Sequence, residues 1–115
     1  KEDYSSTEIL WEELPNVPES QRDPRRRFTA ATKRKCWEKA ANVPFRDPAR
    51  WKRDITGNVI FRKFTNCYGP LCFQYDHWKP HAKGGKSDVA NCKVLRSMTN
   101  NFKSDKYPIT IQELQ

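Results

Sequence analysis

The sequence predicts a small α+β domain, in which two short strands and a helix form the core and further helices are added on the N-terminal side. A length of 115 residues suits a single domain. Helical spacing prevails up to residue 57, and short β-branched and aromatic runs follow it. Four Trp, four Tyr and six Phe supply an aromatic core, although hydrophobic residues make up only 36% of the chain. We divide the chain into an acidic N-terminal helix and linker (1–24), a basic helical segment packing on the core (25–57), the core (58–106) and a C-terminal tail (107–115).

The N-terminal segment predicts one short acidic helix. Ser5 and Glu8 have the spacing of a capping box, apolar residues follow from Ile9 to Leu14, and Pro15 ends the helix. An acidic helix attached to a basic body could dock on that body or on a partner protein, and the sequence leaves both open.

The basic helical segment predicts a helix over about residues 30–42. Cys36, Trp37, Ala40 and Ala41 fall on one face, which indicates packing against a core. Further along, the "RDPARW" stretch places a capping Asp47 before Pro48 and predicts a brief helical turn that ends near Trp51.

The core segment predicts strand, turn, strand, loop, strand and helix. β-Branched and aromatic runs mark strands, Gly-Pro marks the turn, and a stretch rich in Gly, Pro and Ser marks the loop. The tail "YPITIQELQ" is expected to add an edge strand or remain loose. The expected bounds are 58–63 and 73–78 for two strands, 66–72 for the turn, 79–91 for the loop, 92–95 for the third strand and 96–106 for the helix.

The four cysteines, Cys36, Cys67, Cys72 and Cys92, are too few and too unevenly spaced for a secreted disulfide framework. We expect buried free thiols in an intracellular protein that resides in a nucleic-acid-containing compartment: nucleus or organelle in a eukaryote, cytoplasm in a bacterium. No apolar run approaches the length of a membrane span, so no membrane association is expected.

Charge is distributed unevenly along the chain. Residues 1–21 hold one lysine against six acidic residues, a net charge of −5, so residues 22–115 carry +13. A basic body of this size favours nucleic acid through counterion release, with DNA preferred over RNA. General solubility or an acidic protein partner is the alternative. The candidate nucleic-acid contacts are Arg25, Arg26, Arg27, Lys33, Arg34, Lys79, Lys83, Lys86 and Lys103.

Polar residues sit at three points that two antiparallel strands and a helix bring together. Asp76 offers a hard oxygen ligand for a divalent cation. His77, on the opposite side of the same strand or in its bend, could deprotonate a water molecule. Asn100 offers an amide oxygen, and Lys103 lies one turn further on the same helix face, where it could meet a phosphate.

The ordered set Asp76-His77, Pro80, Gly84-Gly85, Asn91, Leu95, Asn100 and Lys103 resembles the HNH nuclease family, which is built on the ββα-metal fold. The resemblance implies an endonuclease in which His77 is the general base and Asp76 and Asn100 hold one divalent metal. It implies that Asn91 fixes the loop and orients the His77 ring through hydrogen bonds. Asn100 stands where many members have a third histidine, and this exchange of nitrogen for oxygen favours Mg²⁺ or Mn²⁺. Products with 5′-phosphate and 3′-hydroxyl ends are implied as well.

The sequence departs from the family where many members hold a structural zinc with two CxxC pairs. Here the first pair is stretched to Cys67 and Cys72, and the second pair's positions hold Arg96 and Thr99. A structural zinc is therefore not expected. An unorthodox site of Cys67, Cys72, His77 and His81 has spacing too short for a zinc finger. His81 is expected to be an exposed loop residue, and Trp78 to pack under the loop or, alternatively, to stack on a base.

Three functions follow from these patterns. The first is a metal-dependent HNH endonuclease. The second is a catalytically silent nucleic-acid-binding component of a ribonucleoprotein or repair assembly, which would be free to lose the polar set that this chain retains. A zinc-stabilised protein-interaction domain ranks last because of the cysteine spacing.

Overall fold

The protein is an α+β domain with two small antiparallel sheets and three helices over the part that the computed structural model describes, residues 14–115. One sheet contains β1 (Ala41–Asn42), β2 (Trp51–Arg53) and β3 (Val59–Phe61), in that order. The other pairs β4 (Phe73–His77) with β5 (Cys92–Arg96). The helices are α2 (Ala30–Lys39), α3 (Ser97–Lys103) and α4 (Ile111–Leu114), and 3₁₀ turns cover Glu19–Gln21, His81–Lys83 and Val89–Asn91. The α+β prediction is confirmed.

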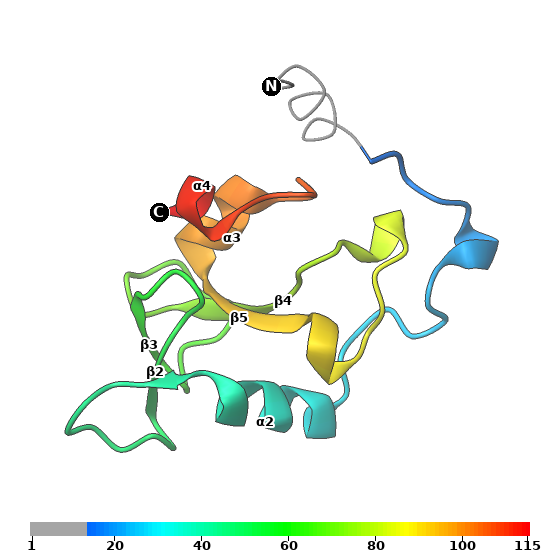
Figure 1. The fold of residues 1–115 in the computed structure, drawn as a ribbon. Coiled ribbons are helices and arrows are strands. Elements are labelled where there is room, and N and C mark those ends of the chain that lie inside the picture. The colour runs from blue at the N-terminus through cyan, green and yellow to red at the C-terminus, as the bar shows by residue number, and fades with distance from the viewer. Residues whose placement is uncertain (1–13) are drawn as a thin grey trace.

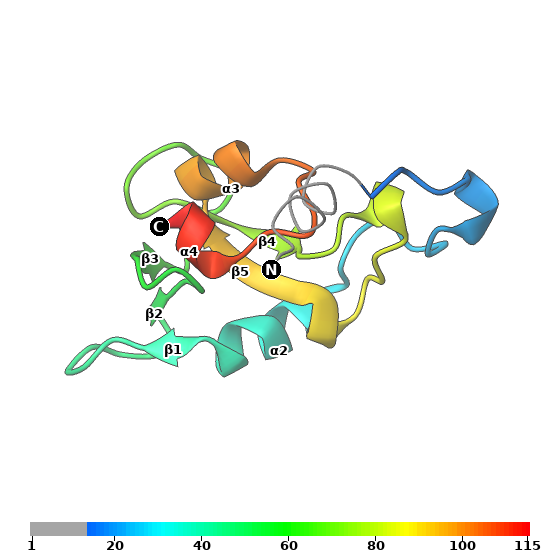
Figure 2. The ribbon, with the colours of Figure 1, turned by 45° about the horizontal axis from the view of Figure 1, so that its top comes forward.

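The β4–β5 ribbon lies at the centre, with α2 on one side and α3 and α4 on the other (Figures 1 and 2). Its two strands pair residue by residue, from Phe73 opposite Arg96 to His77 opposite Cys92. Because side chains alternate along a strand, neighbouring β4 residues face different helices.

The main core forms where α2 packs against this ribbon. Cys36 and Trp37 of α2 are both 1% exposed, which confirms the predicted apolar stripe at its centre. The Trp37 ring lies 5.3 Å from the Phe73 ring, which in turn lies 5.2 Å from Tyr75. Phe28, Ile60, Cys92 and Val94 complete this cluster.

Asp54 joins the three-stranded sheet to the end of β5. One of its carboxylate oxygens accepts hydrogen bonds from the backbone of Thr56 and Asn58, and the other accepts from the backbone N–H of Arg96 at 2.8 Å. The carboxylate is buried, so these bonds replace its water and fix the position where β5 passes into α3.

One helix prediction was wrong in detail. The helix expected over residues 30–42 ends at Lys39, because Ala41 and Asn42 pair with Arg53 and Lys52 in the first sheet. The brief turn predicted after Asp47 is confirmed: the Asp47 side chain accepts the Ala49 N–H, its carbonyl accepts the Trp51 N–H, both at 2.9 Å, and β2 begins at Trp51.

The tail was also predicted wrongly, since it forms neither an edge strand nor a loose end. Thr110 and Glu113 make a reciprocal capping box at the start of α4, and Leu114 is buried. Gln115 further donates a hydrogen bond to the Thr56 carbonyl at 2.9 Å, so the end of the chain docks on the loop after β2.

The cysteines divide into two classes. Cys67 and Cys72 form a disulfide, which corrects the prediction of free thiols at those positions. Cys36 and Cys92 are free and buried, as predicted. The pairing had not been expected because it depends on how the turn brings the two residues together.

The acidic helix predicted at the N-terminus falls on residues 1–13, outside those that the structure describes. The linker that follows lies along the β4–β5 loop, where Val17 N–H donates to the Ala82 carbonyl at 2.9 Å. Within the described residues no helix is long and apolar enough to cross a membrane.

Candidate active site

His77 ends β4 on the face that looks toward α2. Its ring stacks on Phe28, with ring centroids 4.0 Å apart and an interplanar angle of 19°, and its Nε2 lies 2.8 Å from Ser87 Oγ. Burial among these groups lowers the pKa of His77 from its usual 6.5, and the nearby charge of His81 lowers it further. The imidazole is therefore neutral at pH 7 and able to accept a proton.

The hydrogen-bond network identifies which ring nitrogen is free. The Ser87 hydroxyl has a single hydrogen, which it donates to the Arg25 carbonyl oxygen. Ser87 Oγ must then accept its second hydrogen bond from His77 Nε2–H. A neutral imidazole carries one ring hydrogen, so His77 Nδ1 keeps its lone pair for a proton from outside the network.

The segment around Asp23, from the N-terminal half of the chain, holds Ser87 and His81 in place. The Asp23 carboxylate accepts the backbone N–H of Ser87 at 2.8 Å and that of Arg25 at 2.9 Å. The Asp23 carbonyl accepts a hydrogen bond from His81 Nε2 at 2.7 Å. The two hydrogen bonds from the backbone N–H groups of Ser87 and Arg25 lower the pKa of the Asp23 carboxyl and favour its charged form. Together with the stacking of Phe28 on the ring, these hydrogen bonds hold His77 in place. The residues that make them lie far apart in the sequence, so no local pattern predicts this arrangement.

Asn91 ties the β4–β5 loop together. Its side-chain oxygen accepts the Lys79 N–H at 2.9 Å, and its Nδ2 donates to the Lys79 carbonyl at 3.0 Å and the Lys86 carbonyl at 2.9 Å. These bonds occupy the amide, so the expected hydrogen bond from Asn91 to the His77 ring is not made. The ring is oriented by Ser87 instead.

The Gly-Gly pair serves the same loop. Gly84 has φ +95°, a left-handed conformation that favours glycine. A Cβ atom on Gly85 would lie 1.7 Å from the Lys79 carbonyl oxygen and 2.9 Å from Asn91 Nδ2. The space that a side chain at position 85 would need is thus taken up by the loop's own backbone.

Asp76 lies on the other face of β4, against α3. Its Oδ2 is 3.2 Å from Lys103 Nζ, a charge contact without hydrogen-bond geometry. Burial raises the pKa of Asp76 to about 6, and Lys103 offsets part of that rise. One turn earlier on α3, Asn100 donates from Nδ2 to the side-chain oxygen of Gln74, two residues before Asp76. Both α3 residues thus meet the face of β4 that carries Asp76, Asn100 at Gln74 and Lys103 at Asp76 itself.

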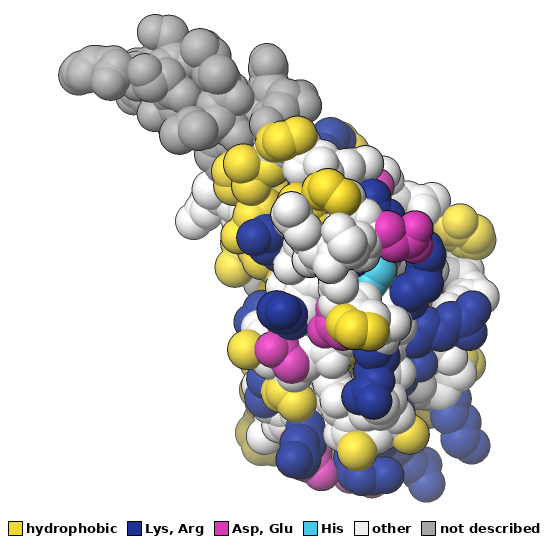
Figure 3. Space-filling model, turned by 90° about the vertical axis from the view of Figure 1, so that its right-hand side faces the viewer, with side chains coloured by type: hydrophobic (Ala, Val, Ile, Leu, Met, Phe, Trp, Pro, Cys, Tyr) yellow, Lys and Arg dark blue, Asp and Glu magenta, His cyan; other side chains and the backbone are white. Residues whose placement is uncertain are grey.

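A pocket of about 330 Å³ opens at the end of β4 and is lined by residues from both faces of that strand. Asp76, His77 and His81 line it together with Asp105, and Arg22 and Arg26 contribute two cations. On this side of the molecule, Figure 3 shows a histidine at the surface with Lys and Arg side chains gathered beside and below it. Neither Arg22 nor Asp105 was singled out from the sequence.

Asp76, which lines this pocket, and Asn100, which does not, carry oxygen donors of the kind that a hard divalent cation takes. Asp76 Oδ2 is buried and accepts no hydrogen bond, and the amide hydrogen bond to Gln74 leaves Asn100 Oδ1 as an acceptor. Among residues 14–115, no group of three or more His, Cys, Asp or Glu side chains lies close enough to hold a metal. Two protein oxygens fit Mg²⁺, which keeps several waters and takes further ligands from substrate phosphates.

The predicted nucleic-acid contacts occupy three places. Arg25, Arg26 and Arg27 are exposed before α2, Lys33 and Arg34 are exposed on α2, and the loop carries exposed Lys86 and half-buried Lys79 and Lys83. Lys103 differs from the rest: it is 0% exposed and faces Asp76, so its ammonium does not reach a phosphate in this arrangement. We assign its charge to the buried pair instead.

Comparison with protein-family models, curated proteins and solved structures found no match to this chain.

Proposed function

We propose that this protein is a metal-dependent endonuclease of the HNH type that hydrolyses phosphodiester bonds with His77 as general base. The resemblance of the ordered polar set implies this reaction. Within that proposal, β4, β5 and α3 correspond to the ββα-metal core. The observation that carries it is the His77 imidazole, which is neutral and held with Nε2–H on Ser87 at the edge of a pocket that Asp76 also lines.

The proposed reaction begins with a water molecule next to the scissile phosphate. His77 Nδ1 removes its proton as the oxygen attacks phosphorus, and the imidazolium that forms keeps its hydrogen bond to Ser87. Asp76 and Asn100 would hold the divalent metal, whose chemistry is to stabilise negative charge on the phosphate oxygens. Arg22 and Arg26 line the same pocket and would attract the polyanion. The bond from phosphorus to the 3′ oxygen breaks, the departing oxygen takes a proton from solvent water, and the products carry a 5′-phosphate and a 3′-hydroxyl.

A catalytically silent nucleic-acid-binding scaffold is the second candidate, and one observation favours it. Asp76 is engaged by the buried ammonium of Lys103, which already supplies the positive charge that a metal would bring. A protein that had given up metal binding would keep Lys103 as the counter-charge of a carboxylate that burial makes costly to ionise. The basic surface serves both candidates equally well.

Plasmid cleavage separates the two candidates. The purified protein is incubated with supercoiled DNA in Mg²⁺, in Mn²⁺ or with a chelator, and binding to the same DNA is measured at several salt concentrations. We expect nicking or cutting with either ion and none with the chelator. The His77→Ala variant should bind as well as the wild type and not cleave. Folded wild-type protein that binds DNA in a salt-sensitive manner but cleaves with no divalent ion would establish the scaffold.

A further inference from the structure

Phe45 occupies the tip of the hairpin that joins β1 to β2, and its side chain is completely exposed, at 106%. The Arg46 N–H donates to the Val43 carbonyl at 3.2 Å, which closes a turn with Pro44 and Phe45 at its centre. Phe45 has φ +65°. Turns with proline first and a positive φ second favour Gly or Asn at the second position, since a side chain there is strained. The exposed ring therefore buries no apolar surface on folding, and the backbone conformation of Phe45 is unfavourable for the folded state.

The hairpin beneath this ring is held firmly. Lys52 is buried, and its ammonium donates to the Ala40 carbonyl at 3.0 Å and to Asn42 Oδ1 at 2.7 Å, which anchors the hairpin to the end of α2. Asp47 accepts the Ala49 N–H and organises the descending side of the loop. The backbone that carries the ring is therefore held in place, and little further ordering of the hairpin is needed for the ring to bind.

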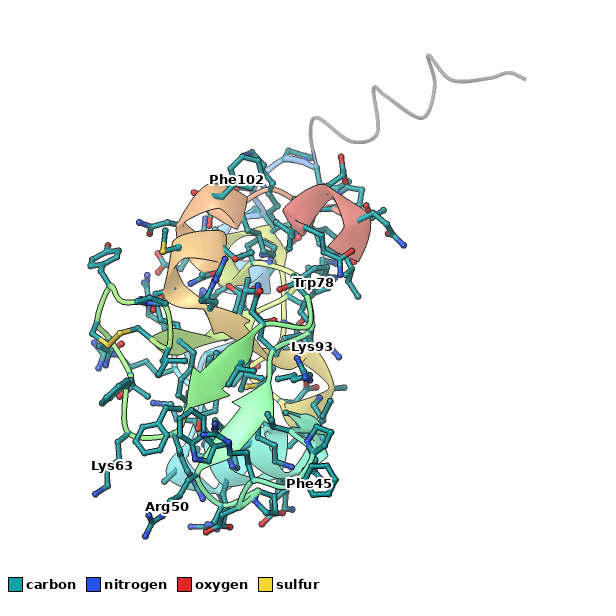
Figure 4. All side chains as sticks on the ribbon, turned by 90° about the vertical axis from the view of Figure 1, so that its left-hand side faces the viewer. Phe45, Arg50, Lys63, Trp78, Lys93 and Phe102 are labelled. Atoms are coloured by element: carbon teal, nitrogen blue, oxygen red, sulfur yellow. A yellow bond between two sulfur atoms is a disulfide. The ribbon has the colours of Figure 1, made fainter. Side chains whose placement is uncertain are left out.

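Two arginines belong to the same loop as Phe45. The Arg46 guanidinium lies 4.5 Å from the centre of the Trp51 ring, which holds it close to the hairpin. Arg50 is 73% exposed, and its contact to Asp47 is long, at 3.9 Å. Figure 4 shows Phe45, Arg50 and Lys63 at the same end of the molecule, the end opposite Phe102.

One aromatic ring among cations is suited to a nucleic acid. Every base offers a flat face on which Phe can stack, and the flanking phosphates are attracted by arginine. A hydrophobic protein partner would instead need a wider apolar surround that excludes water. At this tip the immediate neighbours of Phe45 are Pro44 and the charged Arg46.

We propose that the Phe45 hairpin is a nucleic-acid contact in which the Phe45 ring stacks on an unpaired base while Arg46 and Arg50 contact the flanking phosphates. The contact is separate from the pocket at His77. It rests on nucleic acid as the partner, which the proposed function shares, but not on cleavage.

Binding of a fluorescently labelled single-stranded oligonucleotide to the full chain carrying His77→Ala tests this contact without cleavage. Phe45→Asn removes the ring and suits the positive φ, whereas Phe45→Trp keeps a stacking ring. We expect Phe45→Asn to weaken binding about 5- to 100-fold and Phe45→Trp to stay within about threefold of the parent. Because stacking releases no counterions, Phe45→Asn should keep the salt dependence, whereas Arg50→Gln should reduce its slope by about 0.7.

Tyr68→Asn is the matched control, since it removes another exposed aromatic, 71% accessible, from a different loop. Thermal melting confirms that each variant folds, and Phe45→Asn should melt no lower than the parent. Equal affinity of Phe45→Asn and the parent overturns the inference, as does an equal loss in Tyr68→Asn. Wild-type protein that binds through Phe45 without cleaving any substrate supports the inference and removes the nuclease proposal. If the wild type cleaves normally but Phe45→Asn binds like its parent, the inference is overturned and the nuclease proposal stands.

Discussion

Ser87 Oγ lies 2.8 Å from His77 Nε2, and the Ser87 hydroxyl donates a hydrogen bond to the Arg25 carbonyl oxygen. This relationship sets the tautomer of the imidazole and connects it to the basic segment before α2. Ser87 is therefore a positioning residue: it contacts no substrate in the proposed reaction but fixes the nitrogen that would accept a proton.

Ser87→Ala should lower the cleavage rate about 10- to 100-fold, part of what a general base contributes, while leaving DNA affinity within about twofold. The hydrogen bond from Ser87 N–H to Asp23 survives this change, so the loop should keep its place. ¹⁵N NMR of the ring gives an independent readout, because the wild type should hold the hydrogen on Nε2 and the variant should show both tautomers. An unchanged tautomer in Ser87→Ala would show that another group orients His77.

Phe28→Ala should raise the pKa of His77 toward 6.5 by admitting water to the ring. Burial is the largest cause of the lowered pKa, and Phe28 is the side chain stacked on that ring. A folded-state pKa below the unfolded value makes protonation oppose folding, so wild-type stability should fall as pH drops below about 6.5. An NMR titration of the metal-free wild type and variant measures the pKa of His77 in each. A His77 pKa that is the same in both proteins would contradict the role given to Phe28.

Lys103→Met should destabilise the protein by about 3 kcal/mol because it leaves the Asp76 carboxylate buried without its partner. Asp76→Asn combined with Lys103→Met should recover most of that loss, since no buried charge remains. The folded-state pKa of Asp76, about 6, lies above its usual 3.8. Stability from this group is therefore complete below about pH 3.8 and lost as pH rises through 6. Urea unfolding at pH 4.5 and pH 7 should show that the stability of the double variant relative to wild type is higher at pH 7 than at pH 4.5, and a difference that is the same at both would disprove the assignment.

Gly85→Ala should disrupt the β4–β5 loop, whereas Gly84→Ala should only weaken it. The new Cβ at position 85 would meet the Lys79 carbonyl at 1.7 Å, so the loop must move, at a cost of about 3 kcal/mol or more. At position 84 the new Cβ would make only an ordinary contact with Val17, at 3.8 Å, but φ is +95°, and the cost should be about 1–2 kcal/mol. Chemical denaturation measures both. Equal stability of the two variants would show that the loop is not closed as described.

Local patterns predicted the core elements well, and pairings between distant residues limited the rest. The strands around Phe73 and Cys92 and the helix that follows are each set by a short run, and they lie where expected. Ala41 carries high helix propensity, yet its pairing with Arg53 prevails. The disulfide between Cys67 and Cys72 likewise depends on the shape of a turn that composition does not specify.

The candidate site was predictable on one side only. Strand alternation places Asp76 and His77 on opposite faces, and the helix repeat brings Asn100 and Lys103 onto the face that meets Asp76. Ser87 and Asp23 are 64 residues apart in the chain, and Phe28, from the same segment as Asp23, stacks on His77. The burial of Lys103 was not predictable either. Lysine is expected at the surface, and only the structure shows that this one is buried beside the Asp76 carboxylate.

The central claim is that His77 is the general base, and chemical rescue tests it most directly. Cleavage of supercoiled plasmid in Mg²⁺ or Mn²⁺ is compared for the wild type and for His77→Ala, with and without added imidazole. We predict a loss of at least about 100-fold in His77→Ala, and a partial return of activity that grows with imidazole concentration and with the fraction of neutral imidazole. Cleavage by His77→Ala at the wild-type rate without imidazole would contradict the account.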